Sequence, residues 1–174
     1  NSINMITCGG QSSVPVIMEM KKVIKDIKYV EVISSIASQS AGKATRENIN
    51  EYIINTQRAI GQLSGLKNNK VIINLNPSKP PVNMMNSIFF ECKNVNGKKI
   101  KEANVVLKNI NKTIKKYIPG YNAKLFYKKS EKFFRVTIRV VGSGDYLSTF
   151  AGNLDIITSS SAYIGHLLNE KNNY

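Results

Sequence analysis

Apolar residues recur at every third or fourth position in four stretches of the chain, which is the spacing of an amphipathic helix. These stretches predict helices over residues 13–27, 47–63, 101–117 and 154–168. The third has the most regular pattern, and Pro119-Gly120 directly behind it ends the helix. In the first, we expect Ser12 or Ser13 to cap the helix and Pro15 to lie in the first turn, where proline is tolerated.

Between these helices lie short apolar or alternating segments that predict β-strands. They span residues 29–36, 70–76, 84–92, 123–127 and 133–141. In the last of them Phe134, Val136 and Ile138 alternate with polar residues, which is the pattern of a strand with one buried face. Prolines between residues 77 and 81 predict an extended loop before the third strand.

The order of these elements favours an α/β (or α+β) domain. Helices and strands interleave, but without the regular strand–helix–strand repeat of a parallel sheet. We therefore expect a mixed β-sheet with helices packed on one face. The 174 residues suit one domain with a core of its own, and an apolar content of 42% argues against disorder.

Charge changes this picture little. The chain has 25 Lys and Arg residues against 11 Asp and Glu, a formal net charge of +14. Such an excess can indicate contacts to nucleic-acid phosphates. Here it is mostly lysine, spread in pairs such as Lys98-Lys99, without an arginine cluster or interleaved aromatic residues. We therefore attribute it to solvated lysine-rich faces and expect no nucleic-acid partner, although an anionic substrate would gain from the field.

The cysteine and histidine content argues against a metal site. Cys8 and Cys92 lie far apart in the sequence, and His166 is the one histidine. A structural zinc site needs about four nitrogen or sulfur ligands, so we expect no bound metal. No stretch approaches the roughly 18 to 20 apolar residues of a membrane span, and no secretory signal opens the chain. We expect a cytoplasmic protein without a membrane partner.

Cys8 is the residue that most suggests chemistry. An apolar segment leads to it, and Gly9-Gly10 and small polar residues separate it from the first predicted helix. Backbone N–H groups and the helix dipole at such a position favour a thiolate, and glycine lets the backbone approach whatever meets the sulfur. The alternative is a buried structural cysteine, which is inert packing. We expect Cys92 to be of that kind, and His166 to lie on a helix without a catalytic role.

Three small-residue, polar segments each lead into a predicted helix: the segment around Cys8, residues 38–48, and residues 151–153. If the three helix N-termini point together, they form a pocket that tolerates an anion beside a thiolate. Taken singly, the second segment is an ordinary strand-to-helix loop, and Asn153 is a helix cap.

Five segments, in this order, resemble the acylating acetaldehyde dehydrogenases. These bacterial enzymes convert acetaldehyde, NAD and coenzyme A to acetyl-CoA in the meta-cleavage pathways of aromatic hydrocarbon catabolism. The segments are MITCGGQSSVP at 5–15, SIASQSAGKATRENINEY at 35–52, NLNPSKPPVNMM at 74–85, YIPGY at 117–121 and YLSTFAGNLDIITSS at 146–160. Between residues 86 and 145 the likeness is confined mainly to YIPGY.

The resemblance implies an oxidoreductase in which Cys8 is the nucleophile that carries the acyl thioester, with Asn48 close to the reacting thiol. It implies NAD as cofactor and coenzyme A as co-substrate. The implied cofactor-binding residues are Ser40, Ala41, Gly42, Lys43, Ala44, Thr45, Arg46, Glu47, Asn48 and Asn153. It also implies the fold of the C-terminal domain of enzymes like glyceraldehyde-3-phosphate dehydrogenase.

The likeness concerns one half of such an enzyme. Residues 1–174 resemble the catalytic and dimerisation domain, and the N-terminal dinucleotide-binding domain with its glycine-rich turn is absent from this chain. We therefore expect a homodimer formed through the sheet, an upstream NAD-binding domain as partner, and no turnover by this domain alone. The resemblance also implies an aldolase partner of the 4-hydroxy-2-oxovalerate type.

Two positions depart from the family pattern. Asn86 stands where the family carries an Asp, and an amide cannot act as a base. Residues 42–45 are Gly-Lys-Ala-Thr where the family has Gly-Pro-Gly-Thr. The alternative function is therefore a catalytically impaired homologue that serves as a dimerisation or interaction domain. A basic nucleic-acid-binding protein is the third and least favoured reading.

Overall fold

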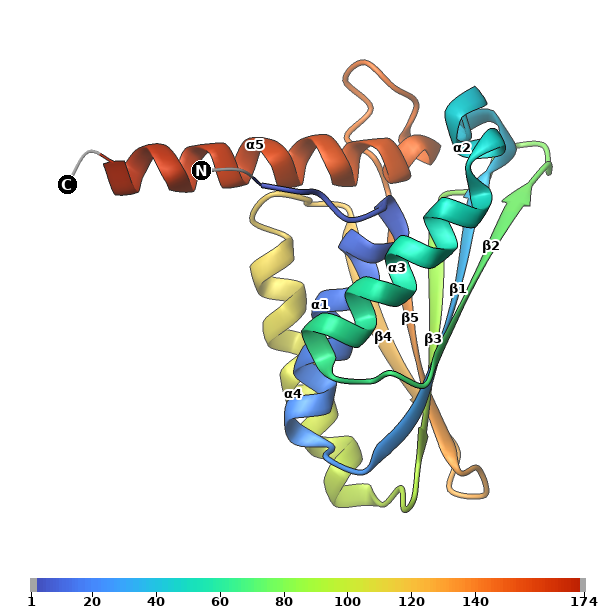
Figure 1. Cartoon of the computed structure of the whole chain (residues 1–174), viewed down its shortest axis with the longest axis vertical. Helices are drawn as coiled ribbons and strands as arrows, with labels where there is room; N and C mark the ends of the chain where they lie inside the picture. Colours follow the sequence, from blue (N-terminus) through green and yellow to red (C-terminus); the bar gives the residue numbers. More distant parts are fainter. Residues whose placement is uncertain (1–2, 173–174) are drawn as a thin grey trace.

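The computed structural model describes residues 3–172 and is built on a five-stranded mixed sheet (Figure 1). The strands are β1 (Ile27–Ala37), β2 (Asn69–Asn76), β3 (Met84–Cys92), β4 (Tyr121–Tyr127) and β5 (Phe133–Val140). Their order across the sheet is β2-β1-β3-β5-β4. β1 and β2 run parallel, and every other neighbouring pair is antiparallel. The mixed sheet expected from the sequence is confirmed.

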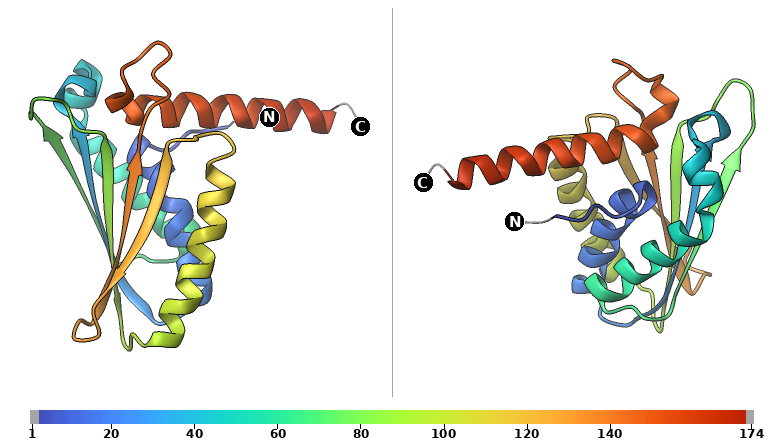
Figure 2. Two further views of the ribbon diagram at one scale, coloured as in Figure 1. Left: turned by 180° about the vertical axis from the view of Figure 1, so that it is seen from behind. Right: turned by 45° about the horizontal axis from the view of Figure 1, so that its top comes forward.

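Three helices cover one face of this sheet and leave the other face open (Figures 1 and 2). They are α1 (Cys8–Val23), α3 (Ile49–Ser64) and α4 (Gly97–Ile114). A longer helix, α5 (Gly152–Asn172), crosses one end of the helical layer and packs on α1. Two short 3₁₀ turns, η1 (Ser38–Ser40) and η2 (Thr149–Ala151), and the short helix α2 (Lys43–Glu47) lie at the same end.

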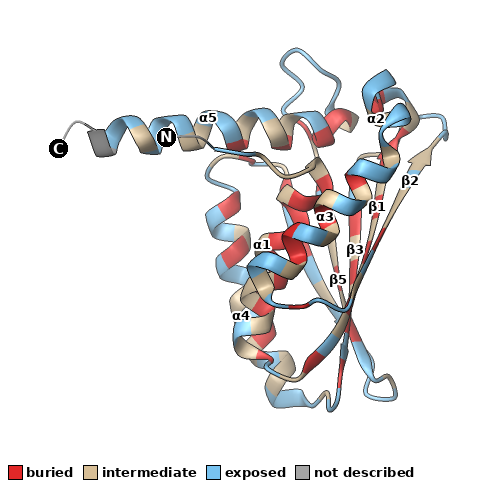
Figure 3. Ribbon diagram, viewed as in Figure 1, coloured by how far each residue is buried: buried red, intermediate tan, exposed pale blue. Residues whose placement is uncertain are grey.

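The core lies between the sheet and the three helices, as the alternation of buried and exposed colours in Figure 3 shows. On β1, Val30, Val32 and Ile36 are fully buried, whereas Glu31 and Ile33 on the opposite face are partly exposed. Alternate side chains of a strand point to opposite faces, so one face of β1 belongs to the core. The helices meet it with residues at helical spacing, such as Val16, Ile17 and Met20 of α1.

The first helix starts earlier than expected. α1 begins at Cys8, so its cap is Thr7, whose hydroxyl accepts a hydrogen bond from the Gly10 N–H at 3.0 Å. The predicted caps Ser12 and Ser13 lie inside the helix, and both hydroxyls donate to the Gly9 carbonyl. Serine bonds back to the preceding turn in this way within helices. The small residues of this turn carry no apolar stripe, which is why periodicity missed it.

Pro15 is therefore inside α1 rather than in its first turn. A proline there removes one backbone donor, so the carbonyl four residues earlier loses its usual helical partner. Other boundaries moved less. Part of the expected loop at 38–46 forms η1 and α2, and α4 begins at Gly97, where the Asn96 side chain caps it by accepting from the Lys99 N–H.

Within residues 3–172, no helix combines the length and the apolar character needed to cross a membrane.

Candidate active site

Cys8 is the first residue of α1, and its side chain is half-buried. The backbone N–H groups of Cys8 and Gly9 lie at the sulfur and act to lower its pKa. The first turn of α1 contains no acidic residue, and Lys21 and Lys22 lie in the last turn. The helix dipole therefore places its positive end at the thiol without a competing carboxylate on the same turn.

Under this turn the core contains polar side chains in place of apolar ones. They come from α1, α3, β1 and β3, and each has 0% of its surface exposed: Ser12, Ser13, Ser34, Thr56 and Asn86. Burying a polar group is unfavourable unless it is hydrogen-bonded. Such a concentration beneath one helix turn, surrounded by valine and isoleucine, marks this end of α1 as different from the rest of the core.

Ser34 and Asn86 lie side by side at the base of this polar cluster. They are register partners on the antiparallel strands β1 and β3. The Asn86 Nδ2 donates to the Gly9 carbonyl at 3.1 Å and also contacts the Ser12 hydroxyl. The Oδ1 atom of Asn86 is buried without a partner. A neutral amide suits this position, because an ionised carboxylate has no hydrogen to offer the Gly9 carbonyl.

The Tyr52 hydroxyl, from α3, reaches both Cys8 and this cluster. It donates to the Ser34 Oγ at 3.1 Å, and it lies beside the Cys8 thiol, whose pKa it acts to lower. The next turn of α3 adds Thr56, whose Oγ1 lies 2.6 Å from that of Thr7 and donates to the Tyr52 carbonyl at 2.7 Å. The thiol is thus surrounded by hydroxyl and backbone donors, and no charged side chain of the described chain is among the groups that shift its pKa.

Burial raises the pKa of the Cys8 thiol to about 11. The hydrogen bonds from the Gly9 N–H, the Tyr52 hydroxyl and the Cys8 N–H lower this pKa, but by less than burial raises it. The backbone N–H groups act in the direction expected from the sequence, but desolvation of the charged sulfur outweighs them, so the pKa of the thiol is raised overall. Burial likewise raises the pKa of Cys92 to about 11, and Cys92 is a core residue as expected.

The predicted cofactor segment lies at the same end of the sheet. Ser40 is buried in η1 and donates from Oγ to the Ala37 carbonyl, and Ala41 behind it is also buried. The Arg46 guanidinium holds the loop together by donating to the carbonyls of Ala41 and Ser38 at 3.0 and 2.6 Å. The remaining predicted residues form the exposed helix α2 with its cap, or follow it: Gly42, Lys43, Ala44, Thr45, Glu47 and Asn48.

Asn153 is the second residue of α5 and not the cap expected from the sequence. It is buried, with 4% of its surface exposed, and its Nδ2 donates to the Ser40 carbonyl at 3.1 Å. Its Oδ1 is buried without a hydrogen-bond partner. Asn153 and Ser40 are thus brought together across 113 residues of sequence, and they leave one amide oxygen with unused acceptor capacity.

Asn48 and His166 are both exposed. The Asn48 amide donates to the Ala44 carbonyl at 2.9 Å, one turn earlier, and its backbone starts α3. Its proximity to the reacting thiol stays a prediction. His166 lies in the outer half of α5.

The starts of α1, α2 and α5 lie at one end of the sheet, the upper end in Figure 1, and the views in Figure 2 agree. α5 packs against α1, and η2 packs against β1. The three polar segments singled out in the sequence therefore occupy one region of the molecule, and the Asn153–Ser40 hydrogen bond joins two of them directly.

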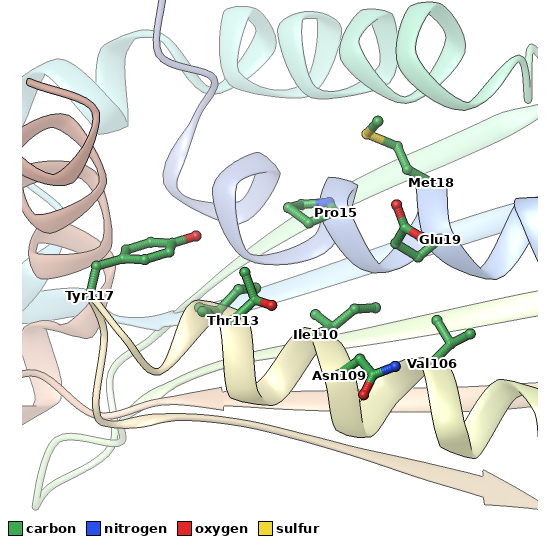
Figure 4. A pocket seen from close by; sticks show the side chains of 9 residues that line it. Pro15, Met18, Glu19, Val106, Asn109, Ile110, Thr113 and Tyr117 are labelled. Carbon is green, nitrogen blue, oxygen red and sulfur yellow. The ribbon is translucent and has the colours of Figure 1, made fainter. Parts of the chain in front are cut away.

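A separate groove of about 370 Å³ lies between α1 and α4 (Figure 4). Its lining is mainly apolar and includes Pro15, Met18, Val106 and Ile110. It begins about two turns along α1 from Cys8. The groove therefore belongs to the helical layer and does not adjoin the thiol.

Sequence reasoning missed Tyr52, Ser34 and Thr56 as neighbours of Cys8. A signal for Ser34 was present: on β1 it interrupts the inward series Val30, Val32, Ile36, and Asn86 interrupts a similar inward series on β3. A polar residue at an inward position of an apolar strand needs a partner. The hydrogen-bond partner of such a residue depends on how the helices pack on the sheet, which the sequence pattern does not show.

Residues 8–148 match a family model described as prokaryotic acetaldehyde dehydrogenase, dimerisation. The match begins at Cys8 and covers most of the chain. The chain belongs to this family. The resemblance inferred from the sequence motifs is confirmed, and the match supports a role in dimerisation.

Curated relatives agree. The chain is 39% identical over 167 residues to an acetaldehyde dehydrogenase of Pectobacterium atrosepticum, covering 96% of this chain and 55% of that protein. It is 39% identical over 160 residues to an acetaldehyde dehydrogenase of Burkholderia thailandensis, covering 92% and 53%. The chain thus spans about half the length of the curated relatives it matches.

Solved structures show the fold. A probable aspartate-semialdehyde dehydrogenase from Pseudomonas aeruginosa aligns with a TM-score of 0.56 at 8% identity, over 93% of this chain and 62% of that one. Aspartate semialdehyde dehydrogenase II of Vibrio cholerae aligns with a TM-score of 0.54 at 6% identity, over 91% and 57%. The chain therefore shares its fold, a mixed sheet with helices on one face as expected, with part of each of these two dehydrogenases.

Proposed function

We propose that this chain is the catalytic and dimerisation domain of an acylating acetaldehyde dehydrogenase, in which Cys8 carries the acyl group from the aldehyde to coenzyme A. The observation that carries the proposal is the position of Cys8: a half-buried thiol at the first residue of α1, where two backbone N–H groups meet the sulfur. Family membership supplies the reaction class.

The chemistry follows from that position. The Cys8 thiolate attacks the carbonyl carbon of acetaldehyde and forms a thiohemiacetal, whose oxygen carries the developing negative charge. We assign the N–H groups of Cys8 and Gly9, which lie at the sulfur, as the donors that stabilise this charge. Loss of a hydride from the same carbon gives the acyl thioester. The thiol of coenzyme A then attacks the thioester and releases the Cys8 sulfur.

NAD, when bound, supplies the hydride acceptor. We assign Asn153 and the adjoining residues Ser40 and Ala41 as the contacts that this domain offers it. In their favour, the Asn153 Oδ1 is buried with unused acceptor capacity and is fixed in place by the amide bond to Ser40. The rest of the dinucleotide site belongs, in this proposal, to a further domain of the longer enzyme, since the relatives are about twice as long.

In this proposal no carboxylate helps to remove the proton from the Cys8 thiol, because Asn86 stands where the family carries an Asp. Asn86 is neutral and is committed to the Gly9 carbonyl, so it takes no proton from Cys8. With the thiol pKa raised to about 11, the thiolate fraction at neutral pH is small. We expect the acyl-transfer rate to rise with pH throughout the neutral and mildly alkaline range.

Acetyl transfer onto the protein tests the proposal without a complete dinucleotide site. The purified protein is incubated with acetyl-CoA, quenched in acid, and digested for mass spectrometry. We expect one acetyl thioester, on Cys8, that forms faster as the pH is raised. The same chain supplied with acetaldehyde, NAD and coenzyme A is expected to form NADH only when a dinucleotide-binding domain is present with it.

Two controls make this test decisive. Cys8→Ser must abolish the thioester, and Cys92 in the same digest reports non-specific acylation of a buried thiol. Acetyl groups distributed equally over Cys8, Cys92 and lysines would contradict the proposal and favour a catalytically impaired interaction domain. The aldolase partner stays a prediction of the resemblance.

A further inference from the structure

Tyr52 lies at the thiol and has no role in the proposed reaction. Its side chain is 8% exposed, and its hydroxyl ends at the Cys8 sulfur. Gly9 leaves the space for it: a Cβ added at Gly9 would overlap the Tyr52 hydroxyl and lie 2.6 Å from the Ser34 Oγ. The absence of a side chain at Gly9 is therefore a condition for the contact between α3 and the first turn of α1.

The Tyr52 hydroxyl also has a defined second partner. Ser34, fully buried on β1, has its Oγ 3.1 Å from it. Both groups are hydroxyls, so either one can supply the hydrogen of this bond. When Ser34 supplies it, the Tyr52 hydrogen is free to point at the sulfur. The two hydroxyls can thus reorient together as the charge on the sulfur changes.

The backbone at Tyr52 is held independently of this contact. Its backbone carbonyl accepts from the Thr56 Oγ1, and Thr56 in turn is bonded to Thr7, the cap of α1. These bonds tie the Tyr52 turn of α3 to the residue that precedes Cys8. The position of the hydroxyl relative to the sulfur is therefore set by the packing of two helices and not by a mobile side chain.

We propose that Tyr52, oriented by Ser34, is a positioning residue that donates a hydrogen bond to the ionised Cys8 sulfur and so makes the thiolate available in a site without a carboxylate base. The proposal rests on the proposed role of Cys8. In the thiol form the Tyr52 hydroxyl donates to Ser34; in the thiolate form it donates to the sulfur, and Ser34 donates to Tyr52.

The surroundings support a neutral donor for this role. Burial raises the pKa of the Tyr52 hydroxyl well above its usual range, so Tyr52 keeps its hydrogen wherever Cys8 titrates. The other neighbours are uncharged: Ser34 on β1, Asn86 on β3 and Thr56 on α3. Of the charged groups at this end of the molecule, Arg58 of α3 lines a groove beside Thr7, and Asp155 of α5 accepts from the Ser143 N–H.

The pH dependence of Cys8 alkylation tests the proposal. Wild type, Tyr52→Phe and Ser34→Ala are treated with iodoacetamide across the alkaline range, and labelling of Cys8 is followed by peptide mass spectrometry. We expect Tyr52→Phe to move the midpoint of the pH dependence of Cys8 labelling to higher pH by about one unit. At any pH below the midpoint, labelling of Cys8 should then be about tenfold slower than in wild type, since one pKa unit is tenfold in thiolate fraction. Ser34→Ala is expected to shift it in the same direction by less.

Tyr121→Phe is the matched control. Tyr121 is another buried tyrosine, and its hydroxyl also donates into α1, to the Ser12 carbonyl at 2.9 Å. Loss of the Tyr121 hydroxyl should destabilise the protein about as much as loss of the Tyr52 hydroxyl. It should leave the pH dependence of Cys8 labelling as it is in wild type. Thermal unfolding of all variants separates a loss of stability from a shift in the titration.

The outcomes are distinct from those of the acetyl-transfer test. A Cys8 profile that is unchanged in both Tyr52→Phe and Ser34→Ala would overturn the role of Tyr52, even where acetyl transfer to Cys8 succeeds. An equal shift in Tyr121→Phe would overturn it too, because the effect would then come from general loosening of α1. Failure of acetyl transfer with a shifted alkylation profile would instead count against the proposed function.

Discussion

At the scale of single residues, the site depends on side chains that are short or missing. Gly9 admits the Tyr52 hydroxyl, and Thr7 caps α1 while bonding to α3. Ser12 and Ser13 satisfy the Gly9 carbonyl from within the helix. Each larger residue at these points would separate the helix turn from the hydroxyls beneath it, because protein interiors have little free volume.

Gly9→Ala should therefore destabilise the protein. The new methyl group has no space against Tyr52 and Ser34, and overpacking of this kind costs about 1–3 kcal/mol in unfolding free energy. Urea denaturation measures the difference. Gly61→Ala in α3 is the control: no atom lies within 4 Å of a Cβ added there, so the better helix propensity of alanine should raise stability by up to about 1 kcal/mol. Equal stability of Gly9→Ala and wild type would contradict the crowding described here.

At the scale of elements, one ion pair fastens the turn after α1 to the start of α4. Asp26 accepts from the Lys99 ammonium at 2.8 Å and from the Asn94 N–H at 3.1 Å. Lys99 also donates to the Asn94 carbonyl. Burial acts to raise the pKa of Asp26, but the hydrogen bonds from Lys99 and Asn94 and the charge of Lys99 together outweigh it, so the pKa is lowered.

Because the pKa of Asp26 is lowered, the free energy of unfolding depends on pH in the acidic range. The contribution of Asp26 is complete above the unfolded-state pKa of about 3.9 and is lost as the pH falls through the lower folded-state value. We expect Asp26→Asn to be less stable than wild type at pH 7 by about 1 kcal/mol, a difference that closes as the pH falls below the unfolded-state pKa of about 3.9. Urea midpoints across this range measure it.

Glu131→Gln is the control for that titration. Its partner Lys128 lies 3.9 Å away with 79% of its side chain exposed, so this pair should contribute little at any pH. A pH-independent difference between Asp26→Asn and wild type would mean that Asp26 acts through packing or a neutral hydrogen bond instead of its charge.

At the scale of the whole molecule, the sheet face without helices carries exposed apolar side chains. Its exposed apolar residues include Met85, Phe126 and Phe133, from three adjacent strands. The Arg135 guanidinium lies 5.0 Å from the centre of the Phe126 ring, and its Nε is buried without a partner. We propose that a second copy of the chain covers this face, in keeping with the dimerisation family that the chain belongs to.

Phe126→Glu should then give monomers. A charge buried at the centre of an apolar contact disfavours association strongly, since it loses its hydration without a partner. Light scattering after gel filtration measures the mass in solution. Val105→Glu on α4 is the control, because Val105 is more exposed than Phe126, at 60% against 46%, but lies on the helical side. Dimers that persist in Phe126→Glu, or are lost in Val105→Glu, would place the interface elsewhere.

The sequence by itself determined most of the elements and the fold class, and it predicts Cys8 as the reactive thiol. Helix and strand periodicities are local, so most boundaries follow from a few neighbouring residues, and β3 is predicted to the residue. The CGG segment and its accompanying motifs are local as well. Where local signals failed, as at the start of α1 and at Asn153, small polar residues carried no stripe to count.

Only the tertiary structure decided what surrounds the thiol. Tyr52, Ser34 and Asn86 come from three elements and meet under Cys8 because α1 and α3 pack on adjacent strands. The same packing desolvates the sulfur, and that desolvation raises the thiol pKa to about 11 although the helix dipole favours a thiolate. Burial and long-range hydrogen bonds depend on how helices lie on the sheet, and no local pattern along the chain records that arrangement.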